Sequence, residues 1–401
     1  MSEATFLEKL LDGAEVEWVA LGEVVKIKHG KNWKKLNSGN IPVYGSGGIM
    51  GHVDTYSCNK PTVLIPRKGS ITNIFYVESP LWNVDTIFYT EIDNNTLTPK
   101  YFYHFMKTVD LLSLDTGSGR PSLTQTILNK IQIPIPCPDN PEESLAIQAE
   151  IVRILDTFTE LTAELTAELT ARTKQYNYYR DQLLTFEDGE ACLSGRQVEW
   201  KTLGEVLTDK FWIMPATPKF DETEEVPYIT SKNIRGGNID FNKVKFISRK
   251  DFQNLSRNRP ILAGDFLISM IGTIGEVARV KEDDLDFYGQ NMYLIRLNPN
   301  LILSGYFLHF FDSPKMKRHF NGVKNNSGQG YLKANNIENI RVPIPPLAEQ
   351  ARIVAILDKF DTLTHSISEG LPREIELRQK QYEYYRDLLL NFPKTQTKGV
   401  A

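Results

Sequence analysis

A stretch of nine residues that occurs twice constrains the fold of this chain more than any other feature. VEWVALGEV (16–24) returns as VEWKTLGEV (198–206), so the two copies lie 182 residues apart. Solenoid repeats span roughly 20 to 50 residues, far less than this distance. The duplication therefore predicts two domains of one fold. Further landmarks keep the same order in both halves: IPVY (41–44) and VPYI (226–229), GSI (69–71) and GTI (272–274), YFYHF (101–105) and YFLHF (306–310), IQIPIP (131–136) and IRVPIP (340–345).

Each half ends in a long segment with the pattern of an amphipathic helix. No proline or glycine occurs from Gln148 to Phe186, and apolar residues recur there at steps of three and four. The word TAEL, built mainly of good helix formers, repeats within TELTAELTAELTA (159–171). Residues 350–392 carry the same apolar stripe. We expect two arms that pack antiparallel as a coiled coil. Packing of each arm on its own domain alone is the alternative.

The two arms differ in length and in one helix-breaking pair. Leu155 to Tyr178 advances 23 residues, whereas the equivalent step from Leu357 to Tyr384 advances 27. The second arm also contains Gly370 and Pro372, which predict a break or kink there.

These features predict an α+β chain with two pseudo-repeated globular domains of mixed strands and short helices. Two long antiparallel helices, forming a coiled coil, separate the domains. A short amphipathic segment, TFLEKLLDG (5–13), is expected to cap the first domain or the arms. The predicted segments are an N-terminal helical segment (1–15), a first domain (16–141), a central arm (142–192), a second domain (193–347) and a C-terminal arm (348–401).

The glycine-rich run IPVYGSGGIMG (41–51) invites a phosphate-binding interpretation, which its spacing does not support. Counting from Gly45 and Gly47, the sixth place of a dinucleotide fingerprint is Met50, and no P-loop Lys-Ser or Lys-Thr pair follows. The equivalent stretch VPYITSKNIRGGNI (226–239) carries its glycines elsewhere. The run is therefore a strand and a turn, serving either as a recognition loop or as a hairpin that only closes a sheet.

Charge is unevenly distributed along a chain whose net charge is −4. Residues 16–140 contain 12 Lys/Arg against 10 Asp/Glu, and residues 198–347 contain 20 against 17. The connector 142–192 contains 4 against 11. Two mildly basic segments flanking an acidic one suit a nucleic-acid contact made by the domains, although chance gives differences of this size too.

Other bulk features indicate a cytoplasmic protein without a membrane partner. No apolar run approaches the roughly 20 residues of a membrane helix, and Glu3 and Glu8 argue against a secretory leader. Cys58, Cys137 and Cys192 are odd in number and widely spaced, as expected of free thiols in a reducing compartment.

The chain resembles the specificity subunits of type I restriction-modification systems, and the resemblance covers almost its entire length. It rests on VEWxxLGEV in each half, VPYITSKNIRGG (226–237), SMIGTIGEVA (269–278), the IPIP and VPIPPLAEQ entries to the arms, the arm ending QYxYYRDxLLxF and the TAEL words. The resemblance implies that the two domains are target-recognition domains, each of which reads one half of a bipartite site in double-stranded DNA. It also implies that the arms set the half-site spacing and dock two methyltransferase subunits, joined by restriction (motor) subunits. S-adenosylmethionine, ATP and magnesium are then expected on those partners, with no cofactor or metal on this chain.

The residues themselves favour a role without catalysis. A methyltransferase acting on an amino group needs an Asn/Asp-Pro-Pro-aromatic loop, yet the only Pro-Pro here lies between Ile344 and Leu347. Glu199-Trp200-Lys201 is a weak nuclease candidate, because the lysine is absent from the first copy. His104 and His309 occupy matched places and are predicted to be hydrogen-bonded core histidines rather than ligands. A self-contained DNA-modifying enzyme and a duplicated protein-binding scaffold without a DNA role are the alternative functions.

Basic and amide side chains on the variable loops are the candidate DNA contacts, since Lys/Arg hold phosphates and Arg, Lys, Asn and Gln read base edges. Trp33 could stack on a base or sugar. Two loops, 117–123 and 326–332, occupy equivalent positions, with Arg120 opposite Gln329. The predicted DNA-binding residues are Lys31, Trp33, Lys34, Lys35, Arg67, Lys68 and Arg120 in the first domain, and Lys232, Asn233, Arg235, Gln329 and Lys333 in the second.

Overall fold

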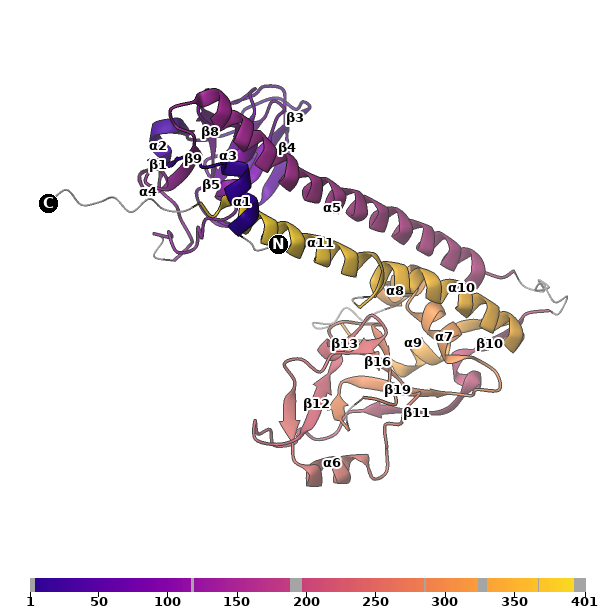
Figure 1. Ribbon diagram of the computed structural model, residues 1–401. Helices are drawn as coiled ribbons and strands as arrows, with labels where there is room; N and C mark the ends of the chain where they lie inside the picture. The colour runs from indigo at the N-terminus through magenta and orange to yellow at the C-terminus, as the bar shows by residue number, and fades with distance from the viewer. Residues whose placement is uncertain are drawn as a thin grey trace. The chain divides into compact units, whose positions relative to one another are not determined.

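The computed structural model describes residues 4–116, 119–187, 197–284, 286–323, 330–366 and 368–392. The chain forms two compact units (Figure 1). Unit 1 contains Met1–Thr166 and Glu374–Ala401, and unit 2 contains Ala167–Arg373. Each unit therefore combines one globular part with pieces of both helical arms. The five segments expected from the sequence stay predictions.

Unit 1 begins with helix α1 (Ala4–Leu11) and contains three small sheets. Strand β1 (Val16–Ala20) pairs antiparallel with β9 (Gln132–Pro136). Short helices α2 (Leu21–Val24), α3 (Pro99–Met106) and α4 (Gln125–Leu128) connect the strands. A four-stranded sheet has the order β2 (Val25–Lys28), β8 (Ile87–Ile92), β5 (Thr62–Pro66), β6 (Phe75–Val77), and a three-stranded sheet has the order β4 (Gly48–Val53), β3 (Ile41–Gly45), β7 (Trp82–Asn83).

Unit 2 repeats these strand orders. Strand β10 (Glu199–Thr202) pairs with β20 (Arg341–Ile344), as β1 does with β9. The duplicated sequence therefore encodes a duplicated fold. The four-stranded sheet has the order β11 (Leu207–Ile213), β19 (Met292–Leu297), β16 (Phe266–Ser269), β17 (Val277–Arg279), and the three-stranded sheet has the order β15 (Lys245–Ile247), β12 (Val226–Thr230), β18 (Tyr288–Gln290). The unit also has β13 (Ile234–Arg235) paired with β14 (Asn238–Ile239), and helices α6 (Arg249–Ser256), α7 (Ser304–Phe311), α8 (Pro314–Val323) and α9 (Ala334–Glu338).

The glycine-rich run of unit 1 forms a hairpin. Strands β3 and β4 are antiparallel, with Gly45 opposite Gly48, so Ser46 and Gly47 make a two-residue turn. Gly48 has a φ of 110°, which a residue with a Cβ rarely adopts. Beyond the turn Ile49 and Met50 are each 57% exposed. The hairpin interpretation is confirmed, and a role in recognition stays a prediction.

The first arm is one uninterrupted helix and the second is broken. Helix α5 (Pro141–Leu184) has 44 residues, about 66 Å at the usual rise. The second arm consists of α10 (Leu347–His365) and α11 (Gly370–Leu390), so the predicted break lies directly before Gly370. Gly370 has a φ of 75°, and a Cβ there would lie 2.4 Å from the carbonyl oxygen of Thr362. Pro372 is tolerated because it lies in the first turn of α11.

The main core of each unit includes the start of one arm and the end of the other. In unit 1, Ile151 and Leu155 of α5 share a core with Leu389 of α11 and with Leu7 of α1. In unit 2, Tyr176 and Leu184 of α5 share a core with Ile353 and Leu357 of α10. Packing of each arm on its own domain alone is therefore wrong. The N-terminal segment, expected to cap the first domain or the arms, contributes to a core that contains both.

Aromatic stacking joins the arms within each unit. Phe158 of α5 stacks on Tyr385 of α11 in unit 1, with ring centroids 5.1 Å apart. Tyr176 and Tyr179 of α5 stack on Phe360 of α10 in unit 2, at 6.2 and 5.6 Å. The contacts run in opposite order along the two arms, as in antiparallel helices.

Cys58 and Cys137 are buried free thiols. Cys192 lies outside the described residues. Within the described ranges, no helix combines the length and apolar character needed to span a bilayer.

Candidate nucleic-acid interface

Each unit fastens its globular part to both arms through a Tyr–His–Asp cluster. In unit 1, His104 of α3 lies 3.0 Å through Nδ1 from the hydroxyl of Tyr382 in α11 and 3.0 Å through Nε2 from Oδ1 of Asp156 in α5. Burial lowers the pKa of His104, and the hydrogen bond to Asp156 opposes that shift in part. The ring is therefore neutral, with Nε2–H donating to Asp156 and Nδ1 accepting from Tyr382.

Unit 2 has the same cluster with the roles of the arms exchanged. Nδ1 of His309 in α7 lies 3.1 Å from the hydroxyl of Tyr176 in α5, and Nε2 lies 2.7 Å from Oδ1 of Asp358 in α10. The guanidinium of Arg180 lies 4.6 Å from the centroid of the Tyr176 ring. Both histidines are hydrogen-bonded core residues, which confirms the sequence prediction. Within each unit, the cluster therefore holds the globular part, with its loops, in a defined position on the helices of the arms.

The loops of unit 1 that contain predicted DNA contacts meet at one edge of the three-stranded sheet. The backbone N–H of Ser46, in the β3–β4 turn, donates to Oγ1 of Thr86 at 3.3 Å. Nδ2 of Asn73 donates to the carbonyl of Ser46 at 3.0 Å. The N–H of Gly69 donates to the carbonyl of Pro121 at 3.0 Å. These hydrogen bonds join four segments that are distant in sequence into one surface, here called the loop edge of unit 1.

Equivalent loops of unit 2 meet in the same way. Oγ1 of Thr273 donates to the carbonyl of Ser231 at 2.8 Å. Gly272 faces the Oγ of Ser231 with a φ of 83°, as Gly69 faces the Oγ of Ser46 with a φ of 86°. The N–H of Leu332 donates to the carbonyl of Met270 at 3.0 Å. The duplication therefore extends from the strands to the loop edge.

The predicted contacts of unit 1 lie on or beside this edge. Lys31, Lys34 and Lys35 are exposed, and half-buried Trp33 packs over Gly51 of β4. Nη1 of Arg67 donates to the carbonyl of Asp85 at 3.2 Å. Lys68 is exposed, and its backbone forms an isolated β-bridge with Ser122, which is close in sequence to exposed Arg120. Residues 117 and 118 of the predicted loop lie outside the described residues. A cavity of 470 Å³, here the unit 1 cavity, is lined by Asn32, Trp33, Lys34, Met50, Val84, Asp85 and Thr86.

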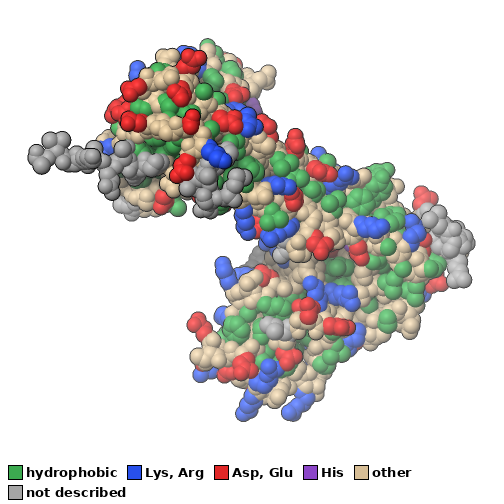
Figure 2. All heavy atoms as spheres, in the orientation of Figure 1, with side chains coloured by type: hydrophobic (Ala, Val, Ile, Leu, Met, Phe, Trp, Pro, Cys, Tyr) green, Lys and Arg blue, Asp and Glu red, His purple; other side chains and the backbone are tan. Residues whose placement is uncertain are grey.

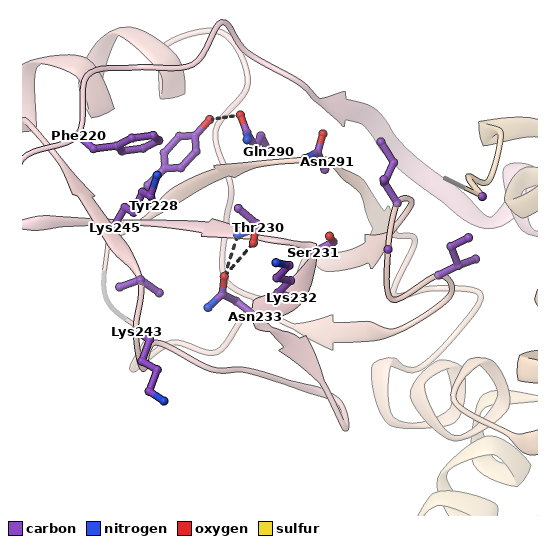
Figure 3. A pocket seen from close by; sticks show the side chains of 15 residues that line it. Phe220, Tyr228, Thr230, Ser231, Lys232, Asn233, Lys243, Lys245, Gln290 and Asn291 are labelled. Atoms are coloured by element: carbon purple, nitrogen blue, oxygen red, sulfur yellow. Dashed lines mark hydrogen bonds between the residues drawn. The ribbon is translucent and has the colours of Figure 1, made fainter. Parts of the chain in front are cut away.

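In unit 2 the structure separates the predicted contacts into three groups. Lys232 and Asn233 line a cavity of 830 Å³, here the unit 2 cavity (Figure 3). Arg235 is exposed on the neighbouring β13, and Lys333 is exposed at the start of α9 without lining the cavity. Gln329 lies outside the described residues. The predicted set thus shares one cavity only in part.

Asn233 has a structural task that sequence alone did not indicate. Its Oδ1 accepts from the backbone N–H and the Oγ1 of Thr230 at 2.9 and 3.2 Å, and its Nδ2 donates to the carbonyl of Asp240 at 2.9 Å. These bonds use most of its hydrogen-bonding capacity. Its neighbours in the cavity are therefore better placed to contact a ligand.

Sequence reasoning missed several polar residues of the two cavities. Lys243 and Lys245 line the unit 2 cavity together with Gln290 and Asn291, and Asp85 lines the unit 1 cavity. A usable signal was the pair of lysines in KVK at 243–245, although Lys243 lies in a turn with a φ of 54° and only Lys245 is in a strand. No local signal marks Gln290 or Asp85, since only tertiary structure brings them to the loop edge.

Basic residues also occur outside the cavities. Arg249, Lys250 and Arg257 are exposed on or next to α6, and Nη1 of Arg249 pairs with Asp286 at 2.6 Å. On the face shown in Figure 2, Lys and Arg side chains alternate with Asp and Glu instead of forming one large basic patch. Electrostatic attraction for an anionic polymer therefore depends on local groups of lysines and arginines.

Comparison with known proteins places the chain in a family. The family model described as type I restriction modification DNA specificity domain matches residues 14–175 and 196–377, one match for each half. A type I restriction enzyme specificity subunit of Escherichia coli is 38% identical, with 99% of each chain covered. A putative type I restriction enzyme specificity subunit of Haemophilus influenzae is 35% identical, with 97% of this chain and 98% of that protein covered.

Solved structures agree on the fold. The S subunit of a type I restriction-modification system from M. genitalium superposes with a TM-score of 0.56 at 17% identity, covering 96% of this chain and 98% of that chain. The chain belongs to the family of type I restriction-modification specificity subunits.

Proposed function

We propose that this chain reads a bipartite sequence in double-stranded DNA, one half-site with each unit, within a type I restriction-modification complex. The observation that carries this proposal is the pair of equivalent loop edges. Both units bring the same four segments together, yet the exposed side chains on those segments differ. One fold with two sets of side chains is the arrangement needed to read two unlike half-sites.

The chain acts in this proposal as an adaptor without catalytic residues of its own. Two methyltransferase subunits and the restriction subunits supply S-adenosylmethionine, ATP and magnesium chemistry, in the cytoplasm where the chromosome lies. The arms are the docking surface, since Tyr178 and its equivalent Tyr384 are 61% and 50% exposed although aromatic. Because the chain itself carries net negative charge, partner subunits provide much of the grip on phosphates.

The central part of α5 is suited to set the distance between the half-sites. Leu161, Leu165 and Leu169 of the TAEL words are half-buried and belong to neither of the two main cores that contain residues of α5. The words lie between Asp156 and Tyr176, so a change of length there removes no residue of either Tyr–His–Asp cluster. Deletion of one word removes four residues, about one helical turn or 6 Å.

The experiment is methylation mapping across the genome of cells that carry the complete complex with one TAEL word added or deleted. We expect the gap between the half-sites to change while the bases read at either end stay the same. An unchanged gap would refute the role of the arm, and the absence of any bipartite methylation by the unmodified complex would refute the function as a whole.

A further inference from the structure

The two cavities occupy equivalent positions in the repeated fold. Asp85 and Thr86 directly precede β8, and Gln290 and Asn291 directly precede β19, its counterpart. In each unit the residue before the strand accepts a backbone hydrogen bond from the loop that follows β5 or β16. The N–H of Arg67 donates to the carbonyl of Thr86 at 2.8 Å, and that of Met270 to the carbonyl of Asn291 at 3.4 Å. Asp85 and Gln290 therefore lie at the same connection of the fold, from β7 to β8 in unit 1 and from β18 to β19 in unit 2.

Parallel strand pairs lead to both cavities. Strand β3 pairs parallel with β7 in unit 1, and β12 pairs parallel with β18 in unit 2. Val84 to Thr86 of the unit 1 cavity follow the carboxyl end of β7, and Ser231 to Asn233 of the unit 2 cavity follow that of β12, the end of parallel strands where open sheets commonly bind ligands. Asn291 has a φ of 65°, a left-handed conformation that asparagine tolerates better than most residues. This sharp turn separates β18 from β19 at the cavity.

Hydrogen bonds orient the amide of Gln290. Its Oε1 accepts from the hydroxyl of Tyr228 at 3.3 Å and lies 3.5 Å from that of Thr217 (Figure 3). With the oxygen held by hydroxyl groups, the amide nitrogen is the atom left to contact a ligand. A side-chain amide nitrogen is a donor only. Gln290 thus presents donors to the unit 2 cavity.

Asp85 presents the opposite chemistry. Its side chain is exposed at the unit 1 cavity, and a carboxylate accepts hydrogen bonds without donating them. It lies in the same cavity as Trp33 and Lys34, and a ligand there can bind the carboxylate only by donating a hydrogen bond. The amino groups of cytosine and adenine are the base-edge donors in the major groove.

The unit 2 cavity is also equipped to hold a phosphate backbone. Lys232, Lys243 and Lys245 line it, and none of them pairs with an acidic side chain among the residues that the structure describes. The Lys245 ammonium lies 4.4 Å from the centroid of the Phe220 ring, which leaves its charge free to attract an anion. Phosphate contacts position a reader and a base-edge contact specifies the sequence.

We propose that Asp85 and Gln290, at the same connection of the two units, are base-reading residues with opposite preference. Asp85 accepts from the exocyclic amino group of a cytosine or adenine in one half-site. Gln290 donates to the acceptor edge of a guanine or thymine in the other. This inference rests on the proposed function and adds the two positions that make the half-sites chemically unlike.

The test uses the complete complex and duplex libraries in which one position of one half-site at a time is randomised. In D85N the carboxylate becomes an amide, and discrimination at one position of the first half-site should fall by roughly tenfold or more. In Q290E the donor becomes an acceptor, and one position of the second half-site should change from a keto base to an amino-bearing base. In each variant the other half-site stays as in the unmodified complex.

A second pair of variants tests the orientation of the amide. Tyr228→Phe removes a hydroxyl that holds Oε1 of Gln290, so the amide can turn and the second half-site should also accept adenine. Tyr288→Phe is the matched control, because the Tyr288 hydroxyl donates to the carbonyl of Arg259 and the residue does not line the cavity. This control should leave base preference unchanged.

Three outcomes overturn the inference. One is an unchanged base preference in both D85N and Q290E, and another is a uniform loss of affinity across all sequences, which would mark backbone contacts. A change in base preference in Tyr288→Phe equal to that in Tyr228→Phe is the third. The proposed function fails separately, if the unmodified complex shows no bipartite preference. Asp85 is exposed, so its substitution keeps the test informative even if a unit 2 variant does not fold.

Discussion

The two units have one fold but differ where loops leave it. In unit 1, β3 turns through two residues directly into β4, whereas in unit 2 the chain runs from β12 into the β13–β14 ribbon before β15 pairs with β12. The cavities differ accordingly, 470 Å³ in unit 1 and 830 Å³ in unit 2. Buried strands are held by the core they share, whereas loops at an exposed edge can change without loss of that core. Under the proposed function, specificity and stability therefore occupy separate parts of this chain.

The Tyr–His–Asp clusters show the same principle with a smaller difference. His104 is 1% exposed and its partner Asp156 also receives Lys100 at 2.7 Å. His309 is 6% exposed, and the side chain of its partner Asp358 is 62% exposed. The unit 1 cluster is thus more enclosed. Loss of its histidine would leave the Tyr382 hydroxyl and the Asp156 carboxylate without that partner, in a place that water cannot easily reach.

The largest expected effect is the loss of stability when the histidine of either cluster is replaced. His104→Ala should destabilise unit 1 by about 3 kcal/mol, because Tyr382 and Asp156 lose their partner in a buried site. His309→Ala should cost roughly half as much in unit 2, since water can solvate Asp358. Hydrogen exchange by mass spectrometry, read separately from peptides of each unit, measures both. Exposed His319→Ala is the control, and equal losses in the two units would contradict the ranking.

A substitution at the break in the second arm is expected to lower stability by about 2 kcal/mol. Gly370→Ala combines an unfavourable φ with a Cβ against the Thr362 carbonyl and should destabilise the junction of α10 and α11 by about that amount. Gly322→Ala in α8 is a control of opposite sign. A Cβ at Gly322 meets nothing within 4 Å, so alanine should be neutral or stabilise by up to about 1 kcal/mol. Thermal unfolding measures the stability of the two variants. A loss of stability in both would show that alanine at any helical glycine destabilises the protein, and would contradict the explanation given for Gly370.

Salt dependence tests whether both loop edges contact phosphates. Replacing Lys232, Lys243 and Lys245 together by Gln should lower the slope of log affinity against log salt by roughly 0.9 for each phosphate that the variant no longer neutralises. The same change at Lys31, Lys34 and Lys35 gives the matching value for unit 1. Lys380→Gln, an arm lysine paired with Glu376 at 2.6 Å, is the control. Binding of the complete complex to its site over a salt series provides the slopes. An unaltered slope in either triple variant would remove that edge from the DNA interface.

The smallest expected effect is the pH dependence that His104 gives to unit 1. Burial lowers the pKa of His104 below its unfolded value of about 6.5, so the unfolded chain binds more protons in mildly acidic solution. Stability should therefore be lost as the pH falls below about 6.5. His104→Gln cannot titrate and should lack this part of the acid-induced loss. Thermal unfolding of both proteins at pH 7.5 and 5.5 provides the comparison, and an identical drop in the variant would assign the effect elsewhere.

The sequence predicted the repeated and local features well. The VEWxxLGEV copies marked equivalent strands and turns, and the family resemblance drawn from the motifs agrees with the family found by comparison. The break at Gly370 followed from local chemistry, because glycine and proline act on the backbone wherever they stand. The lysines at 31, 34, 35 and 232 are exposed at loops, as their polarity indicated.

Tertiary structure decided which distant residues meet. Asp85 and Gln290 carry no local signal, and their place at the same connection of the fold depends on strand order and on backbone hydrogen bonds across long loops. The tyrosine partner of each histidine likewise lies in the arm that ends in its unit, so Tyr382 meets His104 across 278 positions of sequence. Periodicity and propensity report interactions between near neighbours along the chain, whereas contacts over such separations exist only once the whole core has formed.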